Sequence, residues 1–372
     1  MIYFDNAATG GFKPSMVTDT AYNTLKYLCA NPGRSSHRLS LTGAEILFDT
    51  RKEFSDYFSC PLERVIFTKN CTESLNIAIF SLIKKGGHVI TTIYEHNSVL
   101  RPLNYLKEKG EISLSIVSPK DGDIVCAISK KIKKETCLIV TTAVSNVTGE
   151  RLPIKAIGRV CDSHGIPYLV DGAQAGGHVK IDLKEDKVNA LCLAGHKGLY
   201  GIMSTGILLF DENTEIKPLT FGGTGTETFN LSQPTYYPER LESGTLNLPA
   251  IASLKEGLLY VKKNLNNFCY VLEGYTKKII DALLQINDIK VYSKENVSGI
   301  VSFSFSKQDS VTVAEILNSE YDIAVRGGFH CAPLIHKFLG TDKNGLVRVS
   351  LSPQNSLREI NYFLKAVEKI SS

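Results

Sequence analysis

The chain has 372 residues, of which 43% are hydrophobic and 22% charged, and its formal net charge is +4. This length is enough to bury a large core, as one large domain with a smaller one or as two of similar size. Because the charge is small and Lys and Arg are scattered, nothing points to nucleic acid or an anionic membrane as a partner. The start MIYFDNAATGG has no basic segment before an apolar run, and no window is apolar for long enough to span a bilayer, so we expect a cytoplasmic protein.

Nine cysteines make an odd number, and no two of them are separated by only two residues. This spacing argues against a zinc knuckle, a CxxC redox pair and a disulfide framework. Eight lie in or beside apolar runs, which predicts buried structural thiols. These eight are Cys29, Cys60, Cys71, Cys126, Cys137, Cys161, Cys192 and Cys269. Cys331, in the stretch RGGFHCAPL, is the exception.

Short apolar runs alternate with segments of helical period between residues 64 and 210. Runs that are apolar at every position are typical of strands buried on both faces of a sheet. Between two of them, the segment 152–165 has Pro near its start, one apolar face and Gly at its end, which predicts a helix. We therefore predict an α/β fold with a mostly parallel, seven-stranded sheet covered by helices. The predicted strands are RVIFT, HVITT, LSIVS, CLIVTTAVS, IPYLVD, ALCLA and GILLF.

The pattern changes after about residue 250 to long helical stretches, followed by short strands and a final amphipathic helix. This order predicts a smaller α+β domain that carries the Cys331 loop. We assign residues 15–250 to the large domain, and residues 1–14 and 251–372 to the small one. No linker marks the boundary near 250.

Polar side chains follow the predicted strands at the point where each strand ends. In open α/β sheets, ligands collect at the carboxyl ends of the strands, so these residues are expected to form one site. Thr72, in KNCTES, is placed to cap a helix over 73–84, whose free amides could bind phosphate. The other candidates are Asp171, Gln174, His196, Lys197, His96 and Asn146.

A lysine in a glycine-flanked loop, an aspartate at the end of a buried strand and a phosphate-binding helix N-terminus are what pyridoxal phosphate requires. Each feature alone is weak. A lone lysine is usually a solvated surface charge, an aspartate after a strand is often a turn residue, and a threonine before a helix is an ordinary cap. Together, at successive strand ends, they favour this cofactor.

Five motifs resemble the class V aminotransferase family of fold type I pyridoxal phosphate enzymes, and within it the cysteine desulfurase and selenocysteine lyase branch. They are VSNVTGE, VDGAQA, GHKGLYG, ESGTLN and RGGFHCAPL. The likeness runs from residue 3 to about residue 350. It implies conversion of L-cysteine to L-alanine with transfer of sulfur to an active-site cysteine as a persulfide, in sulfur metabolism such as iron–sulfur cluster assembly.

The resemblance also implies roles for single residues. Lys197 would form the Schiff base with the cofactor and move protons, and Asp171 would pair with the pyridine nitrogen. Gln174 would bond the ring hydroxyl, and His96 would stack on the ring.

The remaining implied roles concern phosphate and substrate. Thr72 and His196 would hold the phosphate, and Cys71 and Asn146 are further residues of the cofactor site. Thr245 would reach the phosphate of a partner subunit, which implies a homodimer. Asn146 and Arg348 would hold the substrate carboxylate, for which a guanidinium is the natural bidentate partner.

Two positions depart from the family pattern. Ala194 stands where the family usually has Ser or Thr before GHK, so one phosphate hydroxyl is absent, and Gly225, Thr226 or a backbone amide are the candidates to compensate. Phe329 stands where the family often has histidine. Any acid or base role of that histidine cannot transfer to this chain.

Cys331 has three possible roles. It could be a buried thiol, a metal ligand with His330 and His336, or a nucleophile, and the flanking glycines and proline favour the nucleophile. Nearby positive charge would lower the pKa of its thiol, and Arg326 and His330 are the local candidates. An inert, packed His330 is an equal alternative. The turn is short, as in the second, selenocysteine lyase-like group, so a protein sulfur acceptor of unknown identity would have to come to it.

Two other classes of function remain open. One is a class V enzyme that does not use the thiol, such as an aminotransferase, an epimerase or a kynureninase-like hydrolase. The other is a catalytically silent cofactor-binding scaffold. The sequence does not choose between L-cysteine and L-selenocysteine, because both need the same carboxylate and amine contacts.

Overall fold

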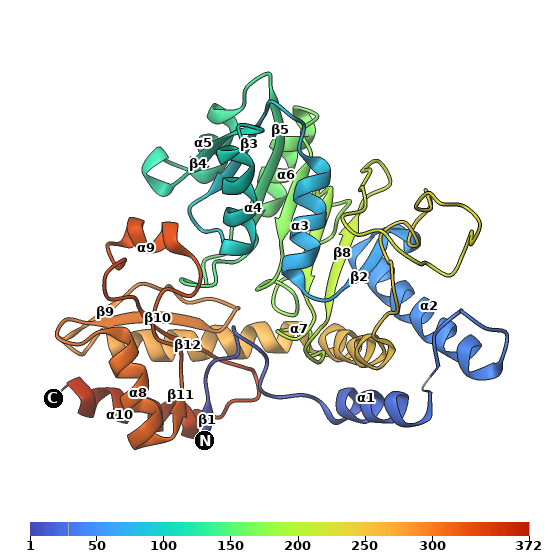
Figure 1. The fold of residues 1–372 in the computed structure, drawn as a ribbon. Coiled ribbons are helices and arrows are strands. Elements are labelled where there is room, and N and C mark those ends of the chain that lie inside the picture. Colours follow the sequence, from blue (N-terminus) through green and yellow to red (C-terminus); the bar gives the residue numbers. More distant parts are fainter. Residues whose placement is uncertain (29, 372) are drawn as a thin grey trace.

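The structure is a computed structural model that describes residues 1–28 and 30–371. Figure 1 shows a central twisted sheet with a long helix beneath it and smaller sheets beside that helix. The strands are β1 Ile2–Tyr3, β2 Val65–Thr68, β3 Gly87–Thr92, β4 Ile112–Val117, β5 Thr136–Thr142, β6 Tyr168–Asp171, β7 Ala190–Ala194, β8 Gly206–Phe210, β9 Ile289–Val291, β10 Ile300–Phe305, β11 Ile323–Ala324 and β12 Val347–Ser350.

The helices connect these strands and cover them. They are α1 Ser15–Tyr27, α2 Arg38–Phe58, α3 Cys71–Leu82, α4 Asn97–Glu108, α5 Ile124–Lys131, α6 Ile154–Ser163, α7 Leu248–Leu283, α8 Ser310–Tyr321, α9 Pro333–Leu339 and α10 Leu357–Ser371. Two short 3₁₀ turns, η1 Leu62–Arg64 and η2 Pro119–Asp121, complete the set. None of the helices in the described ranges is both long enough and apolar enough to cross a membrane.

The central sheet has seven strands in the order β2-β8-β7-β6-β5-β3-β4. All neighbours pair in parallel except β8, which is antiparallel to both β2 and β7. The predicted mostly parallel, seven-stranded α/β sheet is therefore confirmed. The expectation that LSIVS is buried on both faces is wrong, because β4 lies at the edge of the sheet and several of its side chains reach solvent.

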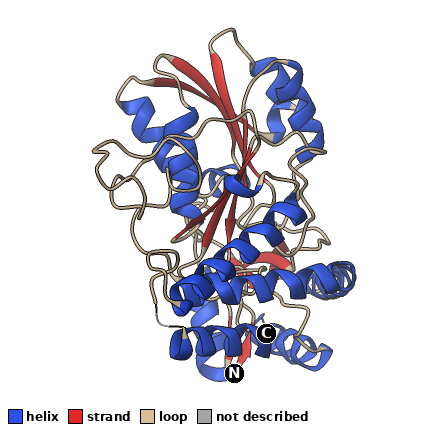
Figure 2. Cartoon of the chain, turned by 90° about the vertical axis from the view of Figure 1, so that its right-hand side faces the viewer, coloured by secondary structure: helices blue, strands red, loops and turns tan. Residues whose placement is uncertain are grey.

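Helices cover both faces of this sheet, as the second view shows (Figure 2). On one face, α3 and α4 pack on residues such as Ile66, Val89 and Leu169. On the other face, α2, α5, α6 and the first turns of α7 pack on residues such as Ile139 and Val170. Because both faces are covered, most side chains inside the strands are apolar, and His88 on β3 and Thr141 on β5 are buried polar exceptions.

The rest of the chain forms two small sheets beside α7. One is antiparallel in the order β12-β10-β9, and the other pairs β1 with β11 in parallel. Helices α8 and α10 close a third hydrophobic cluster with these strands, around Phe303 and Phe363. In Figure 1, the blue N-terminal segment lies beside the red C-terminal strands. The first turn of α7 begins at Leu248, and the division into domains near residue 250 stays a prediction.

Candidate active site

The residues predicted to follow the strands meet at one edge of the central sheet. Asp171 ends β6, His196 and Lys197 follow β7, and His96 follows β3. The charges of Asp171, Lys197, Arg326 and Arg348 all act on the His96 imidazole, so these groups lie near one another. The topology therefore brings together side chains that are far apart in the sequence, as expected for the carboxyl edge of a parallel sheet.

Lys197 lies in the turn directly after β7 and is half-buried. Burial lowers the pKa of its amine, while the Asp171 carboxylate and the Cys71 thiol act in the opposite direction. A lowered pKa increases the share of neutral amine, the form that reacts with carbonyl groups. Lys197 is therefore an activated amine beside a carboxylate.

Asp171 is almost completely buried at the end of β6. Its Oδ1 accepts a hydrogen bond from the backbone N–H of Ala173 at 2.9 Å, and the Cys71 thiol donates to the same oxygen at 3.6 Å. Burial and the nearby Asp171 raise the pKa of the Cys71 thiol well above its usual range, so Cys71 stays a neutral donor. These two donors fix the orientation of the Asp171 carboxyl group in a buried environment.

His96 caps the N-terminus of α4 through its side chain. Its Nδ1 accepts a hydrogen bond from the backbone N–H of Ser98 at 3.1 Å. Burial lowers the pKa of the imidazole to about 4, although the Asp171 charge acts against this shift. Near neutral pH the ring is therefore uncharged, with its proton on Nε2. Ser98, which bonds to His96, also contacts Thr72. The Oγ atom of Ser98 lies 2.8 Å from Oγ1 of Thr72.

The prediction that Thr72 caps α3 is wrong. The N-cap is Asn70, whose extended backbone lets its side chain accept from the N–H of Glu73 at 2.9 Å. The Glu73 carboxylate in turn accepts from the N–H of Lys69, the residue before the cap, at 2.6 Å. Thr72 lies in the first turn of the helix, with its side chain exposed beside Ser98.

Glu95, which sequence analysis did not single out, is completely buried directly before His96. Its Oε1 accepts from the hydroxyl of Thr92 at 2.6 Å, and its Oε2 has no partner within the described part of the chain. Burial raises the pKa of this carboxyl to about 8. Glu95 is therefore mostly protonated at neutral pH and supports the turn that presents His96.

The N-terminal segment holds the loop that carries Lys197. The carbonyl of His196 accepts from Gly10 N–H at 3.0 Å, from Lys13 Nζ at 3.0 Å and from Thr9 Oγ1 at 3.3 Å. Thr9 Oγ1 also lies 3.0 Å from Nδ1 of His196. Burial lowers the pKa of the His196 ring to about 4 and that of Lys13 to about 8. Three donors thus fix the peptide that precedes Lys197.

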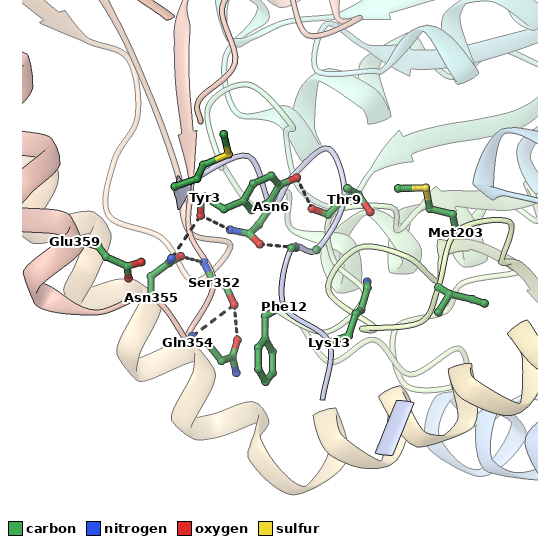
Figure 3. Close-up of a pocket in the computed structure, with 14 residues that line it drawn as sticks. Tyr3, Asn6, Thr9, Phe12, Lys13, Met203, Ser352, Gln354, Asn355 and Glu359 are labelled. Carbon is green, nitrogen blue, oxygen red and sulfur yellow. Dashed lines mark hydrogen bonds between the residues drawn. The ribbon is translucent and has the colours of Figure 1, made fainter. Parts of the chain in front are cut away.

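Figure 3 shows the same segment from the side of an open groove of about 710 Å³, with Thr9, Lys13 and Phe12 along one wall and Gln354 and Asn355 along the other. Lys197 itself lines an adjacent small pocket with Gln174. The Gln174 amide donates to the carbonyl of Ala7 at 2.9 Å, which is a further link to the N-terminal segment.

Arg348, on β12, is the largest of the fully buried side chains, with 1% of its surface exposed. Its NH1 donates to the carbonyl of Asn146 at 3.0 Å, and its NH2 donates to Oδ1 of Asp5 at 2.9 Å. The Asn146 amide donates to the carbonyl of His330 at 2.7 Å. The two residues predicted to hold the substrate carboxylate are therefore adjacent, and they connect to the turn that carries Cys331.

Cys331 lies in the short segment between β11 and α9, and it is exposed. His330 and Cys331 both have positive φ angles, 48° and 57°, which are uncommon for residues with a side chain. The carbonyl of Cys331 accepts from the N–H of Asn97 at 2.7 Å, and Ala332 N–H donates to the carbonyl of Phe329 at 3.0 Å. This backbone places the thiol at the surface of a rigid turn.

The thiol opens into a groove of about 650 Å³ that reaches the residues around His96. In Figure 1, α9 and the turn before it lie near α4. The groove is lined by Thr72, Asn76, Phe80, His96, Asn97, Ser98, Arg101, Pro102, Tyr105 and Cys331. The Cys331 thiol is therefore exposed to solvent and also faces the groove that His96 lines.

His330 is not a source of positive charge for Cys331. The side chain is buried, its Nε2 lies 3.1 Å from the carbonyl of Leu346, and its ring packs 5.8 Å from that of His336. Burial, together with the Arg348 charge, lowers its pKa well below the usual range for histidine. Of the two equal alternatives for His330, these contacts support the packed, neutral ring. Phe329, beside it, is exposed.

The prediction that the other cysteines are buried holds for most of them but not for Cys126. That side chain is exposed on α5, because the buried residues of this helix are its neighbours Ala127 and Ile128. Cys269 is half-buried, and Cys29 lies outside the described residues. Within the described ranges, no three His, Cys, Asp or Glu side chains come together as a metal ion would require.

Thr245 lies in a different surface region. It is exposed, with Oγ1 at 3.5 Å from Nδ2 of Asn31. Gly225 packs on Arg34 in the same region, and the pocket there, lined by Thr224 and Gly244, contains none of the residues assigned above to the same-chain site.

The chain was compared with known families, curated proteins and solved structures. The family model for aminotransferase class V matches residues 2–363. A probable cysteine desulfurase of Pyrococcus abyssi is 32% identical over 100% of this chain and 94% of its own length. A cysteine desulfurase of Escherichia coli is 28% identical over 100% of this chain and 93% of its own length.

Solved structures agree with these relatives. The apo structure of a cysteine desulfurase from Thermococcus onnurineus matches with a TM-score of 0.92 and 31% identity, over 100% of this chain and 94% of that one. Together with the family model, which covers most of the sequence, these matches show that the chain belongs to the class V aminotransferase family of pyridoxal phosphate enzymes.

Proposed function

We propose that the protein is a cysteine desulfurase, which converts L-cysteine to L-alanine and takes up the sulfur atom on Cys331 as a persulfide. The observation that carries this proposal is the exposed Cys331 thiol on a rigid turn, in a groove that His96 also lines and within electrostatic reach of the buried Arg348. The relatives from Pyrococcus abyssi and Escherichia coli, which carry the name cysteine desulfurase, support it.

The residues of the site fit pyridoxal phosphate. Lys197 offers a reactive amine, Asp171 a buried anion for the pyridine nitrogen, and neutral His96 an apolar ring face for stacking. Thr72, the first-turn amides of α3, and His196 would hold the phosphate. When bound, this cofactor supplies an electron sink that weakens bonds to the carbon atoms of an amino acid.

The neighbouring side chains determine how the polar atoms of the site behave. The Cys71 thiol, whose pKa is raised by burial, stays protonated and donates a hydrogen bond to Asp171. His96 stays neutral, so it does not repel the positive charge of Lys197 or Arg348. Burial lowers the pKa of the Lys197 amine, which makes it easier for Nζ to return a proton that it has accepted.

Sulfur transfer uses the Cys331 thiolate as nucleophile. The thiolate attacks the sulfur atom of the bound substrate, a sulfur–sulfur bond forms, and the carbon–sulfur bond breaks with its electron pair left on carbon. A proton then replaces sulfur on that carbon. The sum is L-cysteine plus the Cys331 thiol giving L-alanine plus the Cys331 persulfide, which needs no external oxidant or reductant.

Positive charge near Cys331 comes from arginine rather than from histidine. Arg348 and Cys331 interact electrostatically, and Arg348 also feels the charge of Arg326. These two guanidinium groups, rather than the neutral His330, supply the positive charge on this side of the site. Arg348 would at the same time hold the substrate carboxylate, which places the substrate next to the attacking sulfur.

The test of the proposal is to supply the purified holoenzyme with L-cysteine, L-selenocysteine and a panel of other amino acids. Alanine should appear together with sulfide or selenide in a one-to-one ratio when a reducing thiol is present. Release of a keto acid or of a racemised amino acid without sulfide would instead indicate a class V activity that does not use the thiol.

The assembly and the partner belong to the same proposal. A homodimer is supported by the exposed apolar side chains of the segment before Thr245, where Phe229 is 100% exposed and Leu231 is likewise exposed, since such residues are usually covered in an assembly. Thr245 would then contact the phosphate in the partner subunit. We also propose that a thiol-bearing acceptor enters the groove at Cys331, and that the protein works in the cytoplasm.

A further inference from the structure

The guanidinium group of Arg348 has three nitrogen atoms with three different environments. NH1 donates to the backbone carbonyl of Asn146, and NH2 donates to the carboxylate of Asp5. Nε is buried and has no hydrogen-bond partner among the described residues. An unpaired N–H on a cation that is 1% exposed is costly, which marks Nε as the donor that is free for a ligand.

Asp5 is the acidic group that faces this cation. Burial lowers the pKa of Arg348, the charge of Arg326 lowers it further, and the first influence that raises it is Asp5. The two side chains form a salt bridge in which Asp5 is about one-fifth exposed. Arg326 and Arg348 lie close together and repel each other, and the negative charge of Asp5 offsets part of this repulsion.

The backbone holds Asp5 in place independently of this salt bridge. Residue 5 forms a bridge with Ser350, two positions beyond Arg348 on β12. The neighbouring Asn6 and Ala7 also bond to Ser350, and the hydroxyl of Tyr3 donates to the carbonyl of Asp5 at 3.1 Å. Figure 3 shows Tyr3 and Asn6 side by side in this segment. The Asp5 carboxylate therefore approaches Arg348 from a fixed position.

We propose that Asp5 is a positioning residue that fixes the guanidinium of Arg348, so that Nε remains the donor that meets the carboxylate of the substrate. This inference rests on the proposed function, in which Arg348 binds that carboxylate. The ligand class is an α-amino acid, and the contact is charge-assisted. Asp5 does not touch the substrate; it acts only through Arg348.

A pair of ligands separates this role from a general structural one. Ethylamine is L-alanine without its carboxylate, so the ratio of their dissociation constants reports the carboxylate contact alone. Both would be titrated into the holoenzyme and followed through the visible absorption of the cofactor. In Asp5→Asn, which has the same shape but no charge, we expect L-alanine to bind about tenfold more weakly, as for the loss of support to one charged hydrogen bond. Ethylamine should bind as to the wild type.

Steady-state kinetics provide a second readout. The KM for L-cysteine should rise in Asp5→Asn by more than kcat falls, because the loss concerns binding of the carboxylate. Asp281→Asn, an exposed change on α7, is the matched control and should leave both constants unchanged. Asp5→Ser is a second variant that should give the same ligand selectivity.

Arg348→Met distinguishes the two ways in which the idea can fail. If Arg348→Met loses the preference for L-alanine and Asp5→Asn keeps it, the role of Asp5 is wrong and the carboxylate contact stands. If Arg348→Met keeps the preference, Arg348 is not the carboxylate ligand, and both proposals fall. An equal loss for L-alanine and ethylamine in Asp5→Asn would also overturn the inference, since it would mean general damage to the site.

Discussion

The backbone N–H of Asn97 donates a 2.7 Å hydrogen bond to the carbonyl oxygen of Cys331. The first residue of α4 is therefore tied to the turn that carries the thiol, and His96, directly before it, is tied to that turn as well. Asn146, in the loop after β5, holds the same turn through the carbonyl of His330. The Cys331 thiol and the His96 imidazole are thus positioned by one connected set of hydrogen bonds.

Cys331→Ser should keep its cofactor and still bind L-cysteine, because Lys197, Asp171 and Arg348 are unchanged. Sulfide production should fall at least about a hundredfold, since a neutral hydroxyl is a far poorer nucleophile toward sulfur than a thiolate. Mass spectrometry after brief exposure of the wild type to L-cysteine should find added sulfur on the peptide that contains Cys331. Cys126→Ser, which removes the exposed thiol on α5, is the control. Undiminished alanine production by the Cys331 variant would return this residue to a structural role.

Lys197→Ala should remove the yellow colour of the purified protein, because the visible absorption depends on a covalent link to this amine. The absorption spectrum after reconstitution with pyridoxal phosphate measures this directly. Lys155→Ala changes an exposed lysine on α6 and should leave the spectrum unaltered. A wild-type spectrum in Lys197→Ala would place the link on another lysine.

If Thr245 completes the cofactor site of the partner subunit, a Lys197→Ala subunit and a Thr245→Ala subunit should restore cofactor binding when they form a mixed dimer. Lys197→Ala lacks the amine, and Thr245→Ala should bind pyridoxal phosphate about tenfold more weakly, as for the loss of one hydrogen bond to a charged group. When the two are unfolded and refolded together, the mixed dimer has one complete site and should bind the cofactor as tightly as the wild type. Binding no tighter than in Thr245→Ala alone would show that each site is built from a single chain.

The raised pKa of Glu95 predicts that the free energy of unfolding depends on pH. Its pKa is raised by burial from 4.5 to about 8, so the folded protein holds the proton between these values while the unfolded chain releases it. The stabilising effect of this proton is complete below pH 4.5 and is lost as the pH rises to 8, at about 1.4 kcal/mol per pH unit.

The measurement compares the Tm of Glu95→Gln with that of the wild type from pH 5 to pH 8. Gln keeps the shape and cannot ionise, so the variant should gain stability relative to the wild type as the pH rises. Glu185→Gln, an exposed change, controls for the effect of removing one carboxylate. A constant difference in Tm across this range would mean that Glu95 is already ionised in the folded protein.

Local features of the fold could be predicted from the sequence because they depend on neighbouring residues. Fully apolar runs such as ALCLA predicted buried strands, and the polar residue after each run predicted the site edge. The position of β4 at the edge could not be predicted in this way, because the order of strands depends on contacts between distant segments. The cap of α3 was misassigned because KNCTES contains two residues that can cap, and only the extended backbone at Asn70 decides between them.

In the candidate site, too, the features set by neighbouring residues could be predicted, and those set by contacts between distant segments could not. Lys197 and Asp171 were predicted because they follow strands, and Cys331 because its flanking residues are unusual for a core. The contact between Asp5 and Arg348 joins residues 343 positions apart, so no local pattern reveals it. The environment of His330 could likewise not be predicted, since its contacts with Leu346 and His336 arise only in the folded chain.

The pairing of the N-terminal segment with β11 and β12 has a consequence for synthesis of the protein. Residues 2–7 leave the ribosome early, yet their partners at 323–350 emerge when the chain is nearly finished. Until then, Asp5 lacks Arg348, and Ala7 lacks Ser350. The central sheet can fold early from its own strands, but the substrate pocket closes only after translation of β12. Nascent chains released before that point therefore contain the lysine loop without a functional pocket.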